Sequence, residues 1–343
     1  FHSDVYVSNG GDITRTVKGN ENIEIPIYLS SMTNKNYGNE LFLHYQMLHL
    51  DYLGIEKEID KGVLKIDYSP WMNQPISPLK IKTPKYSGLS KINFTLKDKG
   101  GKIIHRNFMH LVVKSQFKIP KTLVYSIPVK EYSSSKWSKR KWEVLDGLKV
   151  NGTGKGFFEF KISVPSNLDL AGNEEAYFFV EASSKRLYDK DKEKEYEETG
   201  IDYMRGSKVS PHKNPNSYPM TDEIMFPSEI NVSVNGKNKL NTVLSDDPAD
   251  HRGILSWHNQ IRPAGKVTDK DYSEKQRMLN EAGSYGYLVK VPISNEELTE
   301  CKQNGFIKVI LETTGEGGMA IYGKDFGRYP FDPSLVIIKK VEL

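Results

Sequence analysis

The sequence predicts an all-β protein built from two β-sandwiches. Apolar residues alternate with polar residues over most of the chain, which is the period-two pattern of half-buried strands. Gly, Asn and Pro residues that favour turns separate these runs at short intervals. The 343 residues also exceed the usual size of a single domain, so two domains are expected.

The composition is that of an ordinary globular protein, with 37% hydrophobic, 27% charged and 11% aromatic residues. Lys and Arg number 48 against 44 Asp and Glu, and a net charge of +4 is too weak to predict a nucleic-acid partner. No apolar run approaches the roughly 18–20 residues of a membrane helix, so no membrane insertion is expected. The single cysteine, Cys301, excludes an internal disulfide framework and a cysteine-rich zinc site.

The first predicted domain covers residues 1–115. Alternating runs begin near residues 23, 41, 64 and 92, and Gly100-Gly101 precedes a last run over 103–113. A Gly-Gly pair between two alternating runs indicates a hairpin. Short strands over about 100 residues are typical of an immunoglobulin-like sandwich, which is the fold predicted here.

The second predicted domain covers residues 116–343 and follows a linker near 115–120. Its predicted strands lie near 158–164, 177–182, 230–234, 285–291, 307–311 and 335–341. The apolar run 177–182 is typical of a strand buried on both faces, Asn235-Gly236 indicates a type I′ turn, and Ser294 is the expected N-cap of a short helical turn. Strands with long connections predict a jelly roll with an irregular insertion at about 183–228.

A basic and aromatic heptapeptide, Lys136 to Trp142, lies at the start of this domain. Such a mixture also occurs in nucleic-acid and membrane-surface patches. On a nearly neutral chain, we interpret it as a solvated linker whose two tryptophans dock on a sandwich.

Three carboxylates fall within five residues at Asp246, Asp247 and Asp250. Their oxygens could bind Ca²⁺, which takes six to eight oxygen ligands. The spacing is not that of an EF-hand loop, and a turn held by Asx hydrogen bonds and an Asp–Arg pair is the alternative. Ca²⁺ is the only cofactor that the sequence suggests.

A sugar site is the second hypothesis for this region. Trp257 offers an aromatic face, and Asp250, Arg252 and His258 offer planar polar groups for hydroxyls. Two further candidates, Tyr285 and Arg328, stand beside glycines where a ligand or another backbone can approach closely. The alternative is a core tryptophan under a loop.

Four segments of the second region carry a resemblance to a known family: Tyr218-Pro219-Met220-Thr221-Asp222, Asp246 to Gly253, Glu281 to Tyr287, and Ala320-Ile321-Tyr322-Gly323 running on to Gly327-Arg328-Tyr329-Pro330. They resemble the C-terminal region of large, β-galactosidase-like glycoside hydrolase family 2 proteins of the Bacteroides group. The resemblance implies a galactose-binding-like jelly roll after an immunoglobulin-like sandwich. The family's catalytic glutamates lie in a (β/α)₈ barrel that this sequence does not contain, so no residue here inherits a catalytic role.

The resemblance implies a non-catalytic accessory region of a glycoside hydrolase that degrades polysaccharide. The expected partners are a carbohydrate, bound weakly, and the catalytic barrel of the same parent chain. The alternative is a purely structural pair of β domains that pack on the barrel or mediate oligomerisation. The chain starts at Phe1 without an initiator Met or a leader, so we expect a piece of a longer protein or a mature form, and an extracytoplasmic location by family resemblance.

Overall fold

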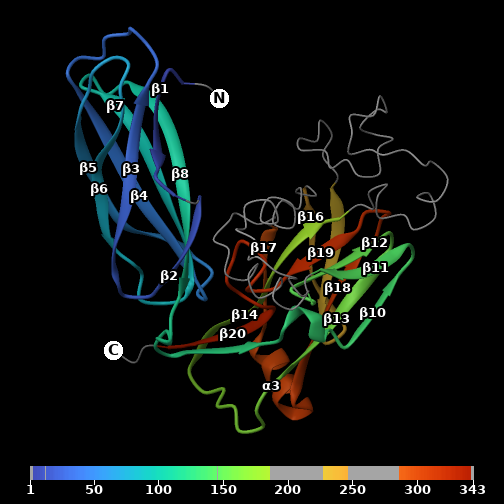
Figure 1. Ribbon diagram of the computed structural model, residues 1–343. Helices are drawn as coiled ribbons and strands as arrows, with labels where there is room; N and C mark the ends of the chain where they lie inside the picture. The colour runs from blue at the N-terminus through green and yellow to red at the C-terminus, as the bar shows by residue number, and fades with distance from the viewer. Residues whose placement is uncertain (1–2, 12, 145, 186–226, 246–285, 341–343) are drawn as a thin grey trace, which may run out of the picture. The chain divides into compact units, whose positions relative to one another are not determined.

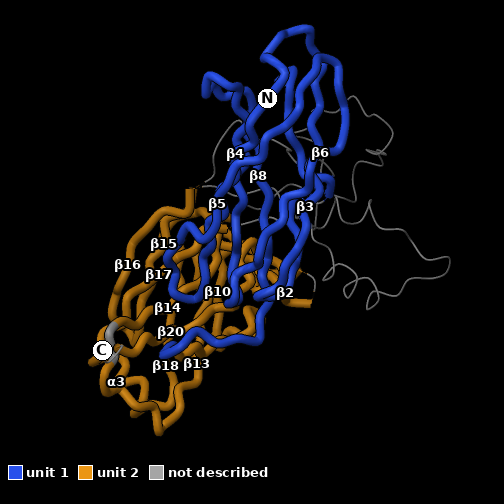
Figure 2. The backbone as a smooth tube through the Cα atoms, turned by 90° about the vertical axis from the view of Figure 1, so that its left-hand side faces the viewer, with its two compact units in different colours: residues 1–122, 278–282 blue, residues 123–277, 283–343 orange. Residues whose placement is uncertain are grey.

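The computed structural model describes residues 3–11, 13–144, 146–185, 227–245 and 286–340. It divides into two compact units, and unit 2 begins at Leu123 (Figure 2). The sequence placed this division a few residues earlier, between 115 and 116.

Unit 1 is a two-sheet sandwich (Figure 1). One sheet has the order β1-β3-β6 and the other β2-β8-β7-β4-β5, and all pairings are antiparallel except β2 with β8. The strands are β1 Val5–Asn9, β2 Thr14–Lys18, β3 Asn22–Ser31, β4 Glu40–Asp51, β5 Glu56–Asp67, β6 Asn73–Lys82, β7 Gly88–Asp98 and β8 Ile103–Lys114.

The core of unit 1 follows from the alternation in the sequence. Ile25, Ile27 and Leu29 of β3 face the other sheet and are buried, whereas Pro26 and Tyr28 between them are exposed. The Gly-Gly hairpin is confirmed between β7 and β8. The N–H of Gly101 donates to the carbonyl of Asp98, and Gly101 takes the left-handed conformation at φ 85°.

Unit 2 is a second, larger sandwich. A five-stranded sheet of order β10-β13-β18-β15-β16 packs on a seven-stranded sheet of order β11-β12-β19-β14-β20-β9, in which β17 also pairs with β14. The strands are β9 Thr122–Ser126, β10 Ser134–Trp137, β11 Arg140–Val144, β12 Lys149–Thr153, β13 Gly156–Ser163, β14 Asn173–Ser184, β15 Ser228–Val234, β16 Lys237–Leu244, β17 Tyr287–Pro292, β18 Phe306–Thr313, β19 Met319–Tyr322 and β20 Ser334–Lys339. A 3-10 turn η1, Val129–Glu131, and one helix, α3 Asn295–Asn304, complete the described residues.

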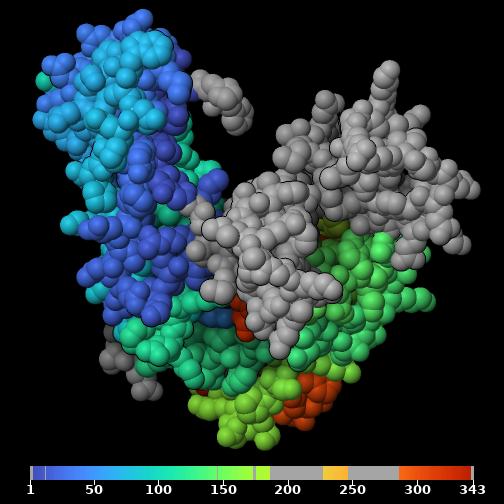
Figure 3. All heavy atoms as spheres, in the orientation of Figure 1, coloured from blue at the N-terminus to red at the C-terminus, as the bar shows by residue number. Residues whose placement is uncertain are grey.

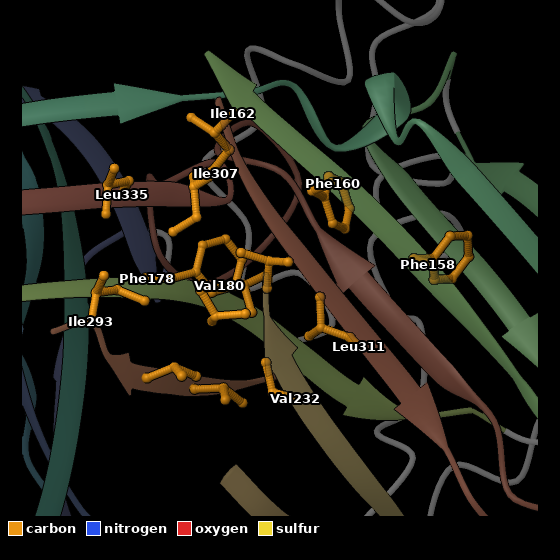
Figure 4. Packing of buried hydrophobic residues seen from close by; sticks show 14 of the residues in the cluster. Phe158, Phe160, Ile162, Phe178, Val180, Val232, Ile293, Ile307, Leu311 and Leu335 are labelled. Atoms are coloured by element: carbon orange, nitrogen blue, oxygen red, sulfur yellow. The ribbon is translucent and has the colours of Figure 1, made fainter. Parts of the chain in front are cut away.

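The core of unit 2 lies between its two sheets. Figure 4 shows Phe158, Phe160 and Ile162 of β13 on one side and Phe178 and Val180 of β14 on the other. All five side chains are buried. Figure 3 shows all heavy atoms of the protein in the orientation of Figure 1. The all-β sandwich class predicted from the sequence is therefore confirmed.

Two local predictions for unit 2 are also confirmed. Asn235 and Gly236 both have positive φ, at 48° and 84°, as a type I′ turn requires between β15 and β16. Ser294 is the N-cap of α3, and its side chain forms a reciprocal capping box with Glu297. The helix runs to Asn304 and is longer than the single turn expected.

The interpretation of residues 136–142 as a solvated linker is wrong. Trp137 ends β10 and Trp142 lies in β11, so the segment belongs to both sheets of unit 2. The sequence lacks apolar alternation here because no side chain of these edge strands is fully buried, so polar residues are tolerated on both faces. Docking of Trp137 is confirmed, since its ring lies 5.0 Å from that of Phe158.

The long insertion falls mostly outside the described residues. Strand β14 continues to Ser184 and β15 begins at Ser228, so the expected break at 183–228 coincides with the end of one strand and the start of the next. In the part of the chain that the structure describes, no helix is long and apolar enough to cross a membrane.

Candidate functional site

The outer face of the seven-stranded sheet carries a set of polar side chains. Because paired residues in antiparallel strands point to the same face, the register aligns Lys149, Tyr322 and Glu181 in one row across β12, β19 and β14. The next row aligns Asn151, Ala320 and Ser183. We call these six residues the polar face, and each is at most 1% exposed. The intervening residues point to the sandwich core.

Glu181 has the strictest hydrogen-bonding requirement of the polar face, because a buried carboxylate needs hydrogen-bond donors. Three backbone N–H groups supply them. Gly286 and Arg328 donate to Oε1 at 2.8 and 3.0 Å, and Tyr329 donates to Oε2 at 2.9 Å. Burial raises the pKa of Glu181, and these donors together with the charge of Arg328 oppose that rise.

Two glycine motifs singled out in the sequence converge on Glu181. A Cβ atom on Gly327 would lie 2.2 Å from Oε2 of Glu181, and one on Gly286 would lie 2.5 Å from the carbonyl oxygen of Ala182. No side chain fits at either distance, so glycine allows the close approach. The close approach that the sequence predicted at these glycines is therefore to protein atoms.

The segment 323–333 reaches Glu181 because of how β19 and β20 pair with β14. Tyr322 is opposite Glu181 and Ser334 is opposite Phe179, so both strands lie on the same side of β14 with only Val180 between their ends. The segment leaves the sheet and returns, with Phe326 buried in a cluster that includes Ala320 and Tyr322. It therefore covers one end of the polar face.

Lys149 is buried on the same face. Its Nζ lies 4.7 Å from the ring centroid of Tyr322 and 5.5 Å from that of Phe326. These are cation–π distances, and such contacts are strongest where water is excluded. The hydroxyl of Tyr322 lies 2.9 Å from that of Ser183. The polar face thus combines an amine, a carboxyl group and two hydroxyl groups on one sheet.

Trp142 lies at the edge of the polar face and is partly exposed. Its register partner on β12 is Asn151, and two cations lie over its ring, with Arg140 Cζ at 5.3 Å and Lys185 Nζ at 6.0 Å from the centroid. Oδ1 of Asn151 is buried without a hydrogen-bond partner among the described residues. An aromatic ring, basic groups and an unsatisfied amide oxygen therefore lie at one corner of the sheet.

A separate pocket of about 210 Å³ lies beside η1. Lys130, Asp146, Lys324, Asp325 and Asp332 contribute the charged part of its lining. Lys324 Nζ lies 3.3 Å from Asp332, whose pKa is raised by burial and lowered in part by Lys324. The pocket offers charge of both signs but no aromatic ring.

Only one of the residues that the sequence singled out for ligand binding lies in the described part of the chain. Arg328 is partly exposed beside Glu181, to which its backbone N–H donates. The others lie outside the described residues: Asp246, Asp247, Asp250, Arg252, Trp257, His258 and Tyr285. Among the residues described, no three His, Cys, Asp or Glu side chains are grouped to hold a metal ion.

The sequence analysis did not single out Glu181 or the polar face. The available signal was the glutamate at position 181 inside the apolar run 177–182, because a charged side chain in a strand buried on both faces must be paired. Its donors are 105, 147 and 148 positions away in the chain, so the sequence pattern alone does not identify them.

No family model matches the chain, and no curated protein matches it. The solved structures that it resembles include an alkylpurine DNA glycosylase, AlkC, of Pseudomonas fluorescens bound to DNA with an abasic site analog, at 12% identity over 32% of this chain and 31% of that chain. They also include native alpha-2-macroglobulin from Escherichia coli, spanning domain MG7 to the C-terminus, at 10% identity over 53% of this chain and 24% of that one. Both TM-scores are 0.22, too low to carry an argument, and the chain spans less than a third of either structure.

Proposed function

We propose that this chain is a non-catalytic accessory region of a glycoside hydrolase family 2 type protein and that unit 2 binds carbohydrate weakly at Trp142. The corner of Trp142 and Asn151 carries the proposal. Trp142 offers a partly exposed indole for the C–H face of a sugar ring, and the partly exposed guanidinium of Arg140 beside it carries N–H groups suited to hydroxyls, whereas Lys185 is buried. Oδ1 of Asn151 is buried at this corner, so the contacts with a sugar would come from Trp142 and Arg140.

The chemistry of Glu181 supports a non-catalytic role. A glycosidase acid or nucleophile has to present an oxygen to the substrate. Both oxygens of Glu181 instead accept backbone N–H groups that hold segment 323–333 and the start of β17. We therefore assign Glu181 to holding the polar face together.

A purely structural role is the second candidate, and the burial of the polar face favours it. Six side chains that are at most 1% exposed within the chain itself offer a sugar no contact and serve packing instead. Under this alternative, Trp142 would contact protein in the parent molecule and would show no response to sugar.

Tryptophan indole signals can separate the two candidates. The chain has four tryptophans, so ¹⁵N-tryptophan labelling of the full chain gives four indole signals, each assigned by its own substitution. Lactose, which presents a β-galactosyl ring, should shift the Trp142 signal, with saturation in the high micromolar to millimolar range because an open face buries little ligand.

Trp142→Ala should abolish saturable lactose binding at this corner. The matched control is Lys141→Ala, since the neighbouring side chain points to the opposite face of β11. A Trp142 signal that stays fixed up to the solubility limit of lactose would favour the structural role. Turnover of nitrophenyl β-galactoside that survives repurification would contradict the non-catalytic assignment.

A further inference from the structure

Trp71 of unit 1 is the most exposed large hydrophobic residue that the structure describes, at 65%. It occupies a turn between β5 and β6 with Pro70 before it and Met72 after it. Its backbone is left-handed, with φ 55°. Glycine or asparagine normally takes that turn position, because a bulky side chain is strained there. A strained backbone that holds an aromatic ring in water calls for an explanation beyond packing.

A hydrogen bond also holds the edge of the Trp71 ring. Nε1 of Trp71 donates to Oδ1 of Asn34 at 2.6 Å. This contact uses the only polar atom of the indole, so the two faces of the ring remain as its interaction surface. A tryptophan fixed by its edge loses less conformational entropy when a ligand stacks on it.

The loop that carries Asn34 is itself fixed by the rest of unit 1. The hydroxyl of Tyr68 donates to the carbonyl of Lys35 at 3.0 Å, and Lys35 Nζ lies 2.6 Å from Asp4. On the other side, the carbonyl of Met72 accepts from the N–H of Ser31 at 2.7 Å. The turn is therefore anchored to β3, and the loop is anchored to Tyr68 and Asp4, which restricts their relative placement.

The loop offers amide groups beside the ring. Asn34 and Asn36 are exposed, and each uses its Oδ1 inside the protein, toward Trp71 and toward the N–H of Gly38. Their NH₂ groups are donors suited to hydroxyl oxygens. An indole face beside amide donors matches a pyranose ring, which presents C–H groups on one face and hydroxyls around its edge.

We propose that Trp71, Asn34 and Asn36 form a saccharide-binding platform on unit 1, separate from the Trp142 corner. The ligand class is a pyranose whose C–H face stacks on Trp71. This proposal rests on the exposure and geometry of unit 1 and does not require the proposed function of unit 2.

The test is Trp71→Gly in the full chain. Glycine suits the left-handed turn position, so the variant should unfold at an unchanged or higher temperature while losing the ligand platform. In the wild type, lactose should shift the Trp71 indole signal and the side-chain amide signals of Asn34 and Asn36 with saturation. Trp71→Gly should abolish the response of the two amides whether or not the Trp142 signal still responds. Phe117→Ala, at another exposed aromatic of unit 1, is the matched control and should leave the Trp71 response intact.

Two results would overturn the platform. One is a Trp71 signal that lactose does not move in the wild type. The other is a clear drop in the melting temperature of Trp71→Gly, which would make Trp71 a packing residue. A response of the Trp142 signal without one of the Trp71 signal would contradict this inference and leave the proposed function unaffected. A response of the Trp71 signal alone would contradict sugar binding at Trp142 and leave this inference unaffected.

Discussion

The carboxylate of Glu181 accepts a hydrogen bond from the backbone N–H of Tyr329 at 2.9 Å, and this contact joins the middle of a central strand to the segment 323–333. The same carboxylate binds the N–H groups of Arg328 and Gly286. One buried carboxylate therefore fixes the segment 323–333 and the residue that precedes β17. Its removal should affect these segments before it affects the core.

Replacing Glu181 by Gln tests this role. The amide keeps the size of the side chain but has one oxygen, so at least one of the three N–H groups loses its acceptor. An unsatisfied buried donor costs about 1–3 kcal/mol. We expect unit 2 to lose that much free energy of unfolding and the amides of Arg328 and Tyr329 to exchange hydrogen faster.

The control is Glu175→Gln on the same strand. Glu175 is exposed and pairs with Lys290 at 2.9 Å, and exposed ion pairs contribute about 0–1 kcal/mol. If the two variants unfold at the same urea concentration and their amides exchange alike, Glu181 does not hold the two segments.

Gly327→Ala should have a similar effect by a different route. The added Cβ would meet Oε2 of Glu181 at 2.2 Å, so the carboxylate or the segment has to move. Overpacking of this kind costs about 1–3 kcal/mol. Because Gly327 and Glu181 act on one contact, the double variant should lose less stability than the sum of the single losses.

Gly315→Ala is the comparison for this change, since an added Cβ at Gly315 has no neighbour within 4 Å. Thermal unfolding of both variants is the measurement. Equal melting temperatures for Gly327→Ala and the wild type would show that the segment adapts without strain.

These residues show which parts of the structure the sequence predicts. Alternation gave the strands with apolar cores, and local chemistry gave the Asn235-Gly236 turn and the Ser294 cap, because each depends on neighbours within a few positions. The edge strands of 134–144 were missed because exposed edges have little apolar alternation. The partners of Glu181 were missed because they come from distant segments that only the folded sheet brings together.

Ser294→Ala tests the predicted N-cap of α3. Oγ of Ser294 accepts from the N–H of Glu297 at 3.2 Å, and Glu297 returns a bond to the N–H of Ser294 at 2.8 Å. Loss of such a cap costs about 0.5–2 kcal/mol. Urea unfolding of unit 2 should show a loss in this range, and Thr at position 294 should restore most of it. Equal stability of the Ala and Thr variants would contradict the role of the cap.

The carboxylates Asp246, Asp247 and Asp250 lie outside the described residues, so Ca²⁺ binding there stays a prediction from the sequence. An ion that binds only the folded chain stabilises it by mass action. Excess chelator should then lower the melting temperature, and Asp250→Asn should remove that sensitivity. A melting temperature that chelator leaves unchanged would favour the turn held by Asx hydrogen bonds.

His49 should make unit 1 less stable in acid. Its Nδ1 lies 2.9 Å from Oγ of Ser90 in a buried site, and burial lowers the pKa of His49, although Asp51 and a backbone contact to Tyr86 partly oppose this. The folded chain therefore binds the proton less readily than the unfolded chain, whose histidine pKa is about 6.5. Stability should be fully present above that pH and should fall as the pH drops below it toward the lowered folded pKa.

The measurement is urea unfolding between pH 8 and pH 5, followed by the ¹⁵N indole signal of Trp71, which is the only tryptophan of residues 1–122. His49→Gln should flatten the dependence on pH. Some slope should remain, because burial also lowers the pKa values of His44 and His105. An unchanged slope in His49→Gln would show that the unfolded and folded chains bind a proton at this position equally well, which would contradict the burial argument.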